Sequence, residues 1–256
     1  MARGPRVAAL GDSLTFGVGD SSTADAGGGW AAHVAASLGA PTFINLAVNG
    51  TRARDLASSQ VPAAVALDPD LVLLSVGGND VLRGDFDPIE VERCLSAALA
   101  ELNRPGRRVL VLGIDRIGLF EALPRAVTSV MARRAAAANG AIIAATASAG
   151  ATLIDGGAVF RAAGPRAWHI DRVHPSPLGH RRLAGAATAL LEGDWPAVAP
   201  VPSAPPSPDL WSRAWWLARN GVPWVALRSR DLIPHVAKVV AHELRADQRG
   251  RLAPAR

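Results

Sequence analysis

Short apolar runs alternate with helix-like patterns along most of this chain, and this alternation restricts the fold more than any other feature of the sequence. The runs predict strands at residues 6–11, 42–47, 70–76, 108–113 and 151–154. The segments between and after them predict helices at residues 29–38, 54–66, 89–103, 123–139 and 177–192. The third and fourth runs are apolar throughout at 71–74 and 109–112, which is typical of strands that are covered on both faces. The order therefore predicts an α/β fold of three layers, with a five-stranded parallel sheet between helices and ligands at the carboxyl ends of the strands.

The composition changes after residue 195 and divides the chain into three parts. Residues 1–195 hold the alternating pattern and form the expected main domain. Residues 196–208 are uncharged and rich in proline, which predicts an extended, semi-rigid linker. Residues 209–256 form a basic tail with four of the seven tryptophans, and two short helices are expected there, separated at 220–223.

The two tail segments are amphipathic. One face of the first segment carries Leu210, Trp211, Ala214, Trp215 and Ala218. One face of the second carries Val236, Val239, Val240 and Leu244, with His235, Lys238, His242 and Arg245 on its other faces. These patterns leave two interpretations open. Residues 209–246 pack on their own domain or on a second copy of the chain, or they anchor the protein peripherally on an anionic membrane.

The formal net charge of +5 does not predict a nucleic-acid partner. Residues 1–195 hold 18 arginines and 18 acidic residues, whereas residues 209–256 hold nine cations and four acids. The excess charge is therefore confined to the tail. Arginine supplies nearly all cations in an alanine-rich chain, which indicates a compositional bias rather than a phosphate-binding surface.

Nothing in the sequence predicts export or a membrane span. No run approaches the ~18–20 apolar residues of a transmembrane helix. Only four apolar residues, 7–10, follow the first arginines, fewer than the ~7–15 of a signal-peptide core. Cys94 is the single cysteine and cannot form an internal disulfide. We therefore expect a cytoplasmic protein.

Polar motifs follow three of the expected strands and precede the last expected helix. Ser13 stands in Gly-Asp-Ser-Leu-Thr after the first strand, Gly50 follows Asn49 after the second, and Asn79 stands in Gly-Gly-Asn-Asp after the third. Asp171 and His174 precede the last helix. Each motif alone is common in turns and caps. Together they supply a hydroxyl nucleophile, an imidazole base, a carboxylate and oxyanion donors, as an acyl-transfer site requires.

These four blocks, in this order, resemble those of the SGNH, or GDSL, hydrolase family, and the resemblance covers roughly residues 5–192. It implies a flavodoxin-like catalytic domain at 1–195 with a C-terminal helical appendage. The resemblance makes Ser13 the nucleophile, His174 the general base and Asp171 the residue that orients His174. It also implies an oxyanion hole from the Ser13 N–H, the Gly50 N–H and the Asn79 side chain.

The resemblance implies cleavage of small-molecule carboxylic esters, as by an esterase or lipase, through an acyl-serine intermediate. The family also contains thioesterases, carbohydrate deacetylases and acyltransferases, so these activities remain alternatives. An alternative of another class is a non-catalytic interaction module that works through the tail. We expect no cofactor, and no metal either, because His174 and His180 lack a third partner at a zinc-like spacing.

Other residues near the motifs receive structural interpretations. Asp12 and Asp80 are expected to cap helices or anchor loops, and His180 to make a structural contact at the start of the last helix. The loops at 81–88 and 114–124 are expected to line the substrate pocket, with Arg116, Ile117, Leu119 and Phe120 as candidate lining residues. Nothing in the sequence assigns a role to His169.

Overall fold

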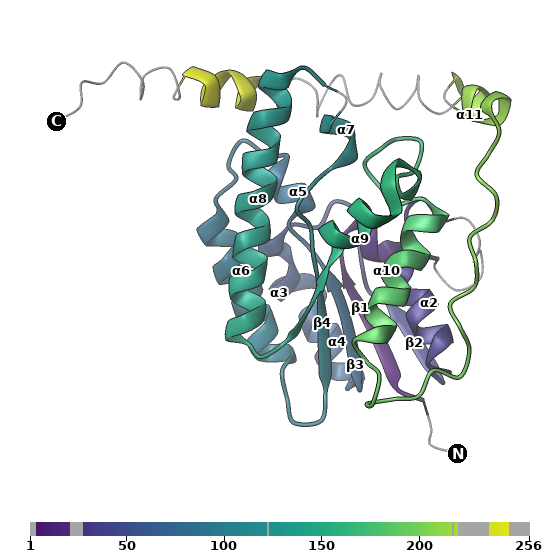
Figure 1. The fold of residues 1–256 in the computed structure, drawn as a ribbon. Coiled ribbons are helices and arrows are strands. Elements are labelled where there is room, and N and C mark those ends of the chain that lie inside the picture. Colours follow the sequence, from purple (N-terminus) through teal and green to yellow (C-terminus); the bar gives the residue numbers. More distant parts are fainter. Residues whose placement is uncertain (1–3, 21–27, 122, 217, 220–235, 246–256) are drawn as a thin grey trace.

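The computed structural model describes residues 4–20, 28–121, 123–216, 218–219 and 236–245. A single parallel sheet forms its centre, with strand order β2-β1-β3-β4-β5 (Figure 1). The strands are β1 (Arg6–Gly11), β2 (Thr42–Asn45), β3 (Leu71–Ser75), β4 (Arg108–Gly113) and β5 (Thr152–Asp155). This order is the flavodoxin-like one. The predicted five-stranded parallel sheet is confirmed.

Helices cover both faces of the sheet (Figure 1). One layer contains the 3-10 turn η1 (Ala53–Asp55) and helices α3 (Leu56–Ser59), α4 (Val61–Leu67), α6 (Pro88–Leu102) and α8 (Arg125–Ser148). The other contains α2 (Trp30–Ser37), α9 (Gly156–Ala163) and α10 (Pro177–Ala189), with the 3-10 turn η2 (Gly164–Ala167) after α9. Three single-turn helices, α1 (Ser13–Phe16), α5 (Gly78–Val81) and α7 (Gly118–Glu121), follow strands β1, β3 and β4.

Alternating side chains of the strands supply two separate cores. In β3, Val72 and Leu74 belong to the cluster under α4, α6 and α8, whereas Leu71 and Leu73 belong to the cluster under α2, α9 and α10. All four side chains are fully buried. The continuous apolar runs of the sequence are therefore explained by burial of the strands on both faces, as expected.

Three expected helices differ from the observed ones. The segment expected at 54–66 is divided into η1, α3 and α4. The break between α3 and α4 is at Gln60, whose side chain bonds to the Gly11 backbone instead of facing solvent. The helix expected at 123–139 continues to Ser148, because the buried side chains of Ile142 and Ala145 extend its packing beyond Gly140. Helix α10 ends at Ala189, earlier than expected.

Helix α9 was not expected from the sequence. Its first residues, Gly156 and Gly157, are typical of a loop. The helix forms there because the Asp155 side chain accepts a hydrogen bond from the Ala158 N–H, and because only a glycine fits so close to β4. A Cβ atom at residue 156 would lie 2.5 Å from the Gly113 carbonyl oxygen.

The proline-rich segment runs beside the domain from the lower to the upper end of the sheet in Figure 1. The Val198 N–H donates to the Ser37 carbonyl, at 2.8 Å, and the Ser37 hydroxyl donates to the Ala199 carbonyl. Residues 201–209 have no regular secondary structure, and α11 (Leu210–Trp216) follows them. The segment is therefore attached to the C-terminal end of α2.

The predicted apolar face of the first tail segment does not pack on the domain. Leu210, Trp211 and Trp215 are 82%, 86% and 68% exposed. Helix α11 instead turns Trp216 inward, onto the ring of His169, with 5.0 Å between ring centroids. Of the interpretations that the sequence leaves open, packing of this face on its own domain is therefore wrong, whereas contact with a second copy or with an anionic membrane stays a prediction. The expected break at 220–223 lies outside the described residues.

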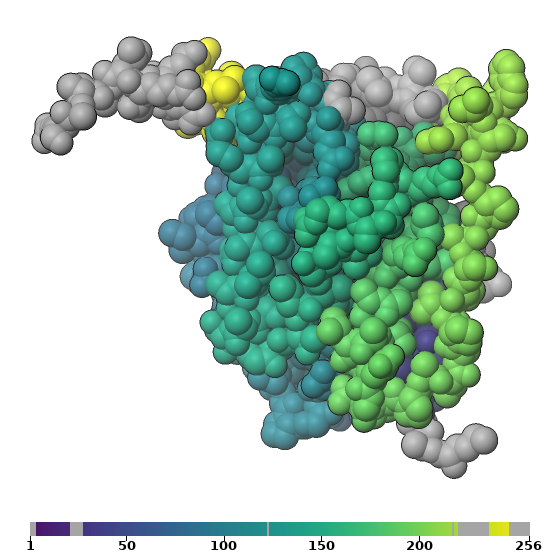
Figure 2. All heavy atoms as spheres, in the orientation of Figure 1, coloured from purple at the N-terminus to yellow at the C-terminus, as the bar shows by residue number. Residues whose placement is uncertain are grey.

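The second tail segment does pack on the domain, as a helix over residues 236–245 beside α8 (Figure 2). Val239 and Val240 are buried, and Val240 belongs to a third apolar cluster with Phe120, Val130 and Met131. Val236 and Leu244 pack against this cluster, whereas Lys238, His242 and Arg245 are exposed. Glu243 accepts a hydrogen bond from Arg134 at 2.8 Å. His235, which was expected on a polar face, lies outside the described residues.

No helix in the described part of the chain combines the length and apolar character that a bilayer crossing requires.

We expect Val240→Ala to destabilise the protein, because the valine methyl groups are buried against α8. At about 0.8 kcal/mol per buried carbon, plus a cavity contribution, the free energy of unfolding should fall by roughly 1 to 2 kcal/mol. Trp211→Ala is the matched control, since Trp211 lies on the exposed face of α11. Thermal unfolding of both variants tests this, and equal melting temperatures for the two would show that residues 236–245 do not pack as described.

Candidate active site

Ser13 is held at the carboxyl end of β1 by a turn that only glycine permits. Gly11 has a φ of +119°, and a Cβ atom there would lie 1.8 Å from the Ser75 carbonyl oxygen. The Asp12 N–H donates to this same carbonyl, and the Asp12 carboxylate accepts from the Leu14 N–H. Asp12 thus caps α1, as expected. Ser13 is the first residue of this helix, at the rim of the sheet.

His174 lies between Ser13 and Asp171, within hydrogen-bond distance of both. The His174 Nε2 atom is 2.9 Å from the Ser13 Oγ atom, and its Nδ1 atom is 2.8 Å from Asp171 Oδ2. Because an ionised carboxylate can only accept, the Nδ1 atom carries the proton and Nε2 is free to accept from the serine hydroxyl. The three predicted residues therefore form one hydrogen-bonded series.

The loop that carries this histidine is fixed by its own backbone. The His169 N–H donates to the His174 carbonyl at 2.9 Å, and Trp168 pairs with Pro175 in an antiparallel bridge. The Asp171 Oδ1 atom accepts from the His174 N–H, so Asp171 contacts both the backbone and the ring of His174. The loop thereby sets the orientation of the imidazole before any ligand binds.

Asp171 remains ionised in this environment. Its burial alone would raise the pKa, but the nearby His169 ring and the hydrogen bonds from His174 outweigh burial and hold the pKa of Asp171 well below its usual range. The His169 Nδ1 atom lies 3.4 Å from the Asp171 carboxylate. His169 therefore contacts the same carboxylate as His174, a contact that no sequence pattern indicated.

Gly50 and Asn79 lie on the wall of the same cavity as Ser13. Gly50 has a φ of +88°, and no heavy atom lies within 4 Å of the position that a Cβ atom would occupy at this residue. Neither the Ser13 N–H nor the Gly50 N–H donates to a described residue. The Asn79 amide donates to the Thr51 carbonyl at 3.1 Å, which leaves its second N–H for another acceptor. The site therefore holds several donors without an internal acceptor.

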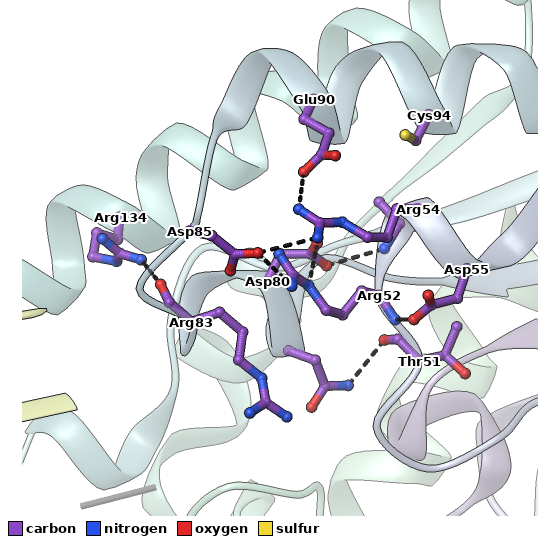
Figure 3. Close-up of polar contacts among 12 residues, drawn as sticks. Thr51, Arg52, Arg54, Asp55, Asp80, Arg83, Asp85, Glu90, Cys94 and Arg134 are labelled. Carbon is purple, nitrogen blue, oxygen red and sulfur yellow. Dashed lines mark hydrogen bonds and ion pairs between the residues drawn. The ribbon is translucent and has the colours of Figure 1, made fainter. Parts of the chain in front are cut away.

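A network of charged side chains joins the loop after Gly50 to helix α5 (Figure 3). Arg52 Nε donates to Asp80 at 3.3 Å, and its Nη1 atom donates to Asp85 at 3.0 Å. Asp80 also accepts from the Ala53 N–H, and Arg54 pairs with Asp85 and Glu90. Asp80 is thus a loop anchor, as expected. Through it, the segment that carries Asn79 is tied to the one that carries Gly50.

Two buried groups near the site have altered pKa values. Burial raises the pKa of Asp12 to about 6, although hydrogen bonds from the Leu14 N–H and the Ser75 hydroxyl oppose the shift. Burial lowers the pKa of His180 to about 4, so this ring is neutral. His180 accepts from the Trp30 N–H and donates to the Val18 carbonyl. The structural contact that the sequence predicted for His180 is confirmed.

The cavity that contains Ser13 has a volume of about 610 Å³. The two loops expected to line it contribute Leu82, Arg83, Ile114, Asp115, Arg116 and Ile117. The other two candidate lining residues, Leu119 and Phe120, pack in the third apolar cluster instead. Sequence reasoning missed the aromatic side of the cavity, which is formed by Phe160, Trp168 and Trp216. Trp168 stands six residues before His174, but Trp216 lies far away in the tail and carries no local signal.

Among the residues that the structure describes, no group of three or more His, Cys, Asp or Glu side chains could hold a metal ion.

The chain is similar to known proteins both in sequence and in fold. The profile of the GDSL-like lipase/acylhydrolase family matches residues 9–182. The chain is similar to esterase TesA of Pseudomonas aeruginosa, with 30% identity over 110 residues, or 41% of this chain and 52% of TesA. The match therefore spans about half the length of that curated relative.

Two solved structures are similar in fold. An acetylxylan esterase from Geobacillus stearothermophilus has a TM-score of 0.62 and 23% identity, over 77% of this chain and 99% of that one. An α/β hydrolase from the metagenome of Lake Arreo, Spain, has a TM-score of 0.60 and 24% identity, over 74% and 95% of the two chains.

Asp12 should make stability depend on pH in a direction opposite to that of most carboxylates. Its pKa is about 6 in the folded protein and 3.8 in the reference state, so its contribution to stability is complete below pH 3.8 and is lost as the pH rises through 6. Asp12→Asn removes this dependence. Relative to the wild type, the variant should gain roughly 2 kcal/mol of stability between pH 4 and pH 7, at about 1.4 kcal/mol per pKa unit, because part of the contribution is already lost at pH 4. Urea unfolding at both pH values measures the gain, and an equal difference at the two would refute the assignment.

Proposed function

Because the chain belongs to the GDSL-like lipase/acylhydrolase family, we propose that it hydrolyses carboxylic esters of small molecules through an acyl-Ser13 intermediate. One observation carries the proposal, namely the series Ser13–His174–Asp171 with contacts of 2.9 and 2.8 Å beside a cavity. The solved structures of the acetylxylan esterase include catalytic mutants in which a serine, an aspartate or a histidine is replaced by alanine. These are the residue types of the series proposed here.

In the first step, the Ser13 Oγ atom attacks the carbonyl carbon of the ester while His174 Nε2 takes the hydroxyl proton. The tetrahedral intermediate then collapses, the bond to the alcohol oxygen breaks, and His174 returns the proton to that oxygen. Asp171 holds the Nδ1–H tautomer and stabilises the imidazolium that forms. Its low pKa suits this role, because the carboxylate stays ionised throughout.

In the second step, water replaces the alcohol. His174 removes a proton from the water, the hydroxide oxygen attacks the acyl carbon, and the bond to Ser13 Oγ breaks with return of the proton to the serine. The products are a carboxylic acid and the free enzyme. A thioesterase or a carbohydrate deacetylase would follow the same steps, and an acyltransferase would replace the water with another acceptor.

The negative charge of each tetrahedral intermediate lies on the former carbonyl oxygen. The Ser13 N–H, the Gly50 N–H and the second N–H of the Asn79 amide are the proposed donors to this oxygen. The ties from Asn79 to Thr51 and from Asp80 to Arg52 support the assignment, because they hold the donor segments together before substrate binds. Preorganised donors of this kind stabilise the transition state without a further reorganisation.

Ser13→Ala tests the nucleophile. We expect the wild type to hydrolyse para-nitrophenyl acetate and to be labelled by a fluorophosphonate probe, and the variant to lose the label and roughly 10⁴-fold or more of kcat. Ser58→Ala, at an exposed serine in α3, is the control and should keep both. A folded Ser13→Ala protein with normal turnover would refute the proposed mechanism. A wild type that neither reacts with the probe nor cleaves esters would favour the non-catalytic interaction module.

Asn79→Ala tests the oxyanion donors separately. Loss of one preorganised donor should lower kcat by about 10²- to 10³-fold, with a much smaller change in KM. The melting temperature of the variant shows whether the lost contact with Thr51 unfolds the protein. A rise in KM at constant kcat would mean that Asn79 binds the substrate equally in the ground and transition states, contrary to the assignment.

A further inference from the structure

A second cavity, of about 770 Å³, adjoins the active-site cavity. Its walls are η2, the loop that carries His174, the start of α10, residues 205–208 of the proline-rich segment, and α11. It shares three residues with the active-site cavity, Trp168, His169 and Trp216. The segment from 205 to 216 lies beyond the residues 9–182 that the family profile matches. This part of the chain therefore adds a wall beside the active site.

The side chains of the second cavity carry positive charge that no described acid neutralises. Arg166, Arg172 and Arg213 line it, and none of the three makes a side-chain hydrogen bond or ion pair with a described residue. Asp209 is the one carboxylate among the described lining residues, and it accepts from the Ser212 N–H at the start of α11. Elsewhere, arginines such as Arg107 and Arg134 are paired with acids. Three guanidinium groups around one cavity are therefore available to an anionic ligand.

The chemistry of the proposed reaction determines which part of an ester faces this cavity. The alcohol oxygen receives its proton from His174 Nε2, so the alcohol part of the ester lies on the side of the loop that carries His174. Residues 168–172 of that loop form the wall between the two cavities. The acyl part then lies on the opposite side, towards Leu82, Ile114 and Ile117.

The boundary between the cavities is aromatic and well fixed. Trp168 stacks on Phe160, with 4.2 Å between ring centroids and 19° between the ring planes. Trp216 meets the His169 ring edge to face. Such a boundary can hold a flat or apolar part of the alcohol between the reacting ester and the arginines.

We propose that the second cavity binds an anionic group on the alcohol part of the substrate, so that the enzyme prefers esters of alcohols that bear a phosphate or a carboxylate. The inference rests on the ester hydrolysis proposed above and extends it to the class of alcohol. Guanidinium groups bind both anions with paired hydrogen bonds. The preference should weaken at high ionic strength, because the three arginines are exposed to solvent.

Matched acetate esters test the preference. The substrates are para-acetoxybenzoate and para-acetoxyphenyl phosphate, which are anionic, and para-acetoxybenzamide, which is neutral. The measured quantity is the ratio of kcat/KM for an anionic ester to kcat/KM for the neutral ester. For the wild type we expect this ratio to fall, for at least one anionic ester, as the sodium chloride concentration is raised. In the double variant Arg166→Ala/Arg213→Ala this ratio should fall about tenfold, as expected for the loss of two charge-assisted contacts. The two anionic substrates also show whether phosphate or carboxylate is the preferred group.

Arg182→Ala is the control, because Arg182 is an exposed arginine of α10 that lines neither cavity. It should keep the wild-type ratio, and Arg166→Lys/Arg213→Lys should keep most of it. The inference is overturned if the ratio for both anions is the same in the wild type and in the Arg166→Ala/Arg213→Ala variant, or if Arg182→Ala lowers it equally. Failure of the wild type to cleave even the neutral ester would instead refute the proposed ester hydrolysis.

Discussion

The contact between Gly11 and the Ser75 carbonyl is the constraint on which the site depends. It allows the chain to leave β1 in a turn that a side chain would block, and the same carbonyl accepts from the Asp12 N–H. Ser13 is thereby held at the sheet rim, at the N-terminus of α1. Gln60 secures this turn from the other side, since its amide both accepts from and donates to the Gly11 backbone. A polar side chain between α3 and α4 is buried for this reason.

Buried polar contacts then connect the remaining parts of the site. Gln60 donates to the Thr51 hydroxyl, the Thr51 carbonyl accepts from Asn79, and Arg52 pairs with Asp80. The segments that follow β1, β2 and β3 are consequently linked by hydrogen bonds. Partly buried networks of this kind restrict the geometry of the groups they hold, since each member would be left unpaired by a displacement. The oxyanion donors proposed here benefit directly from that rigidity.

The tail contributes to the molecule in two different ways. Residues 236–245 cover apolar side chains beside α8 and α7, whereas α11 leaves its tryptophan-rich face exposed and contributes Leu210, Arg213 and Trp216 to the cavities. The proline-rich segment allows α11 to reach the cavities, because it carries the chain along α2 and α10 to the end of the sheet where Ser13 lies (Figure 1). An extended linker of this composition holds its two ends apart.

Sequence patterns were sufficient to predict the five-stranded parallel sheet and five site residues that lie around one cavity, namely Ser13, Gly50, Asn79, Asp171 and His174. These features are local, because apolar runs report burial and short motifs report turns at strand ends. Tertiary structure alone decided the length of α8, the existence of α9 and the exposed face of α11. It also decided the pairing of Arg52 with Asp80 and the meeting of Trp216 with His169. Each of these depends on contacts between residues distant in the sequence, and an amphipathic pattern does not specify which surface, if any, will cover it.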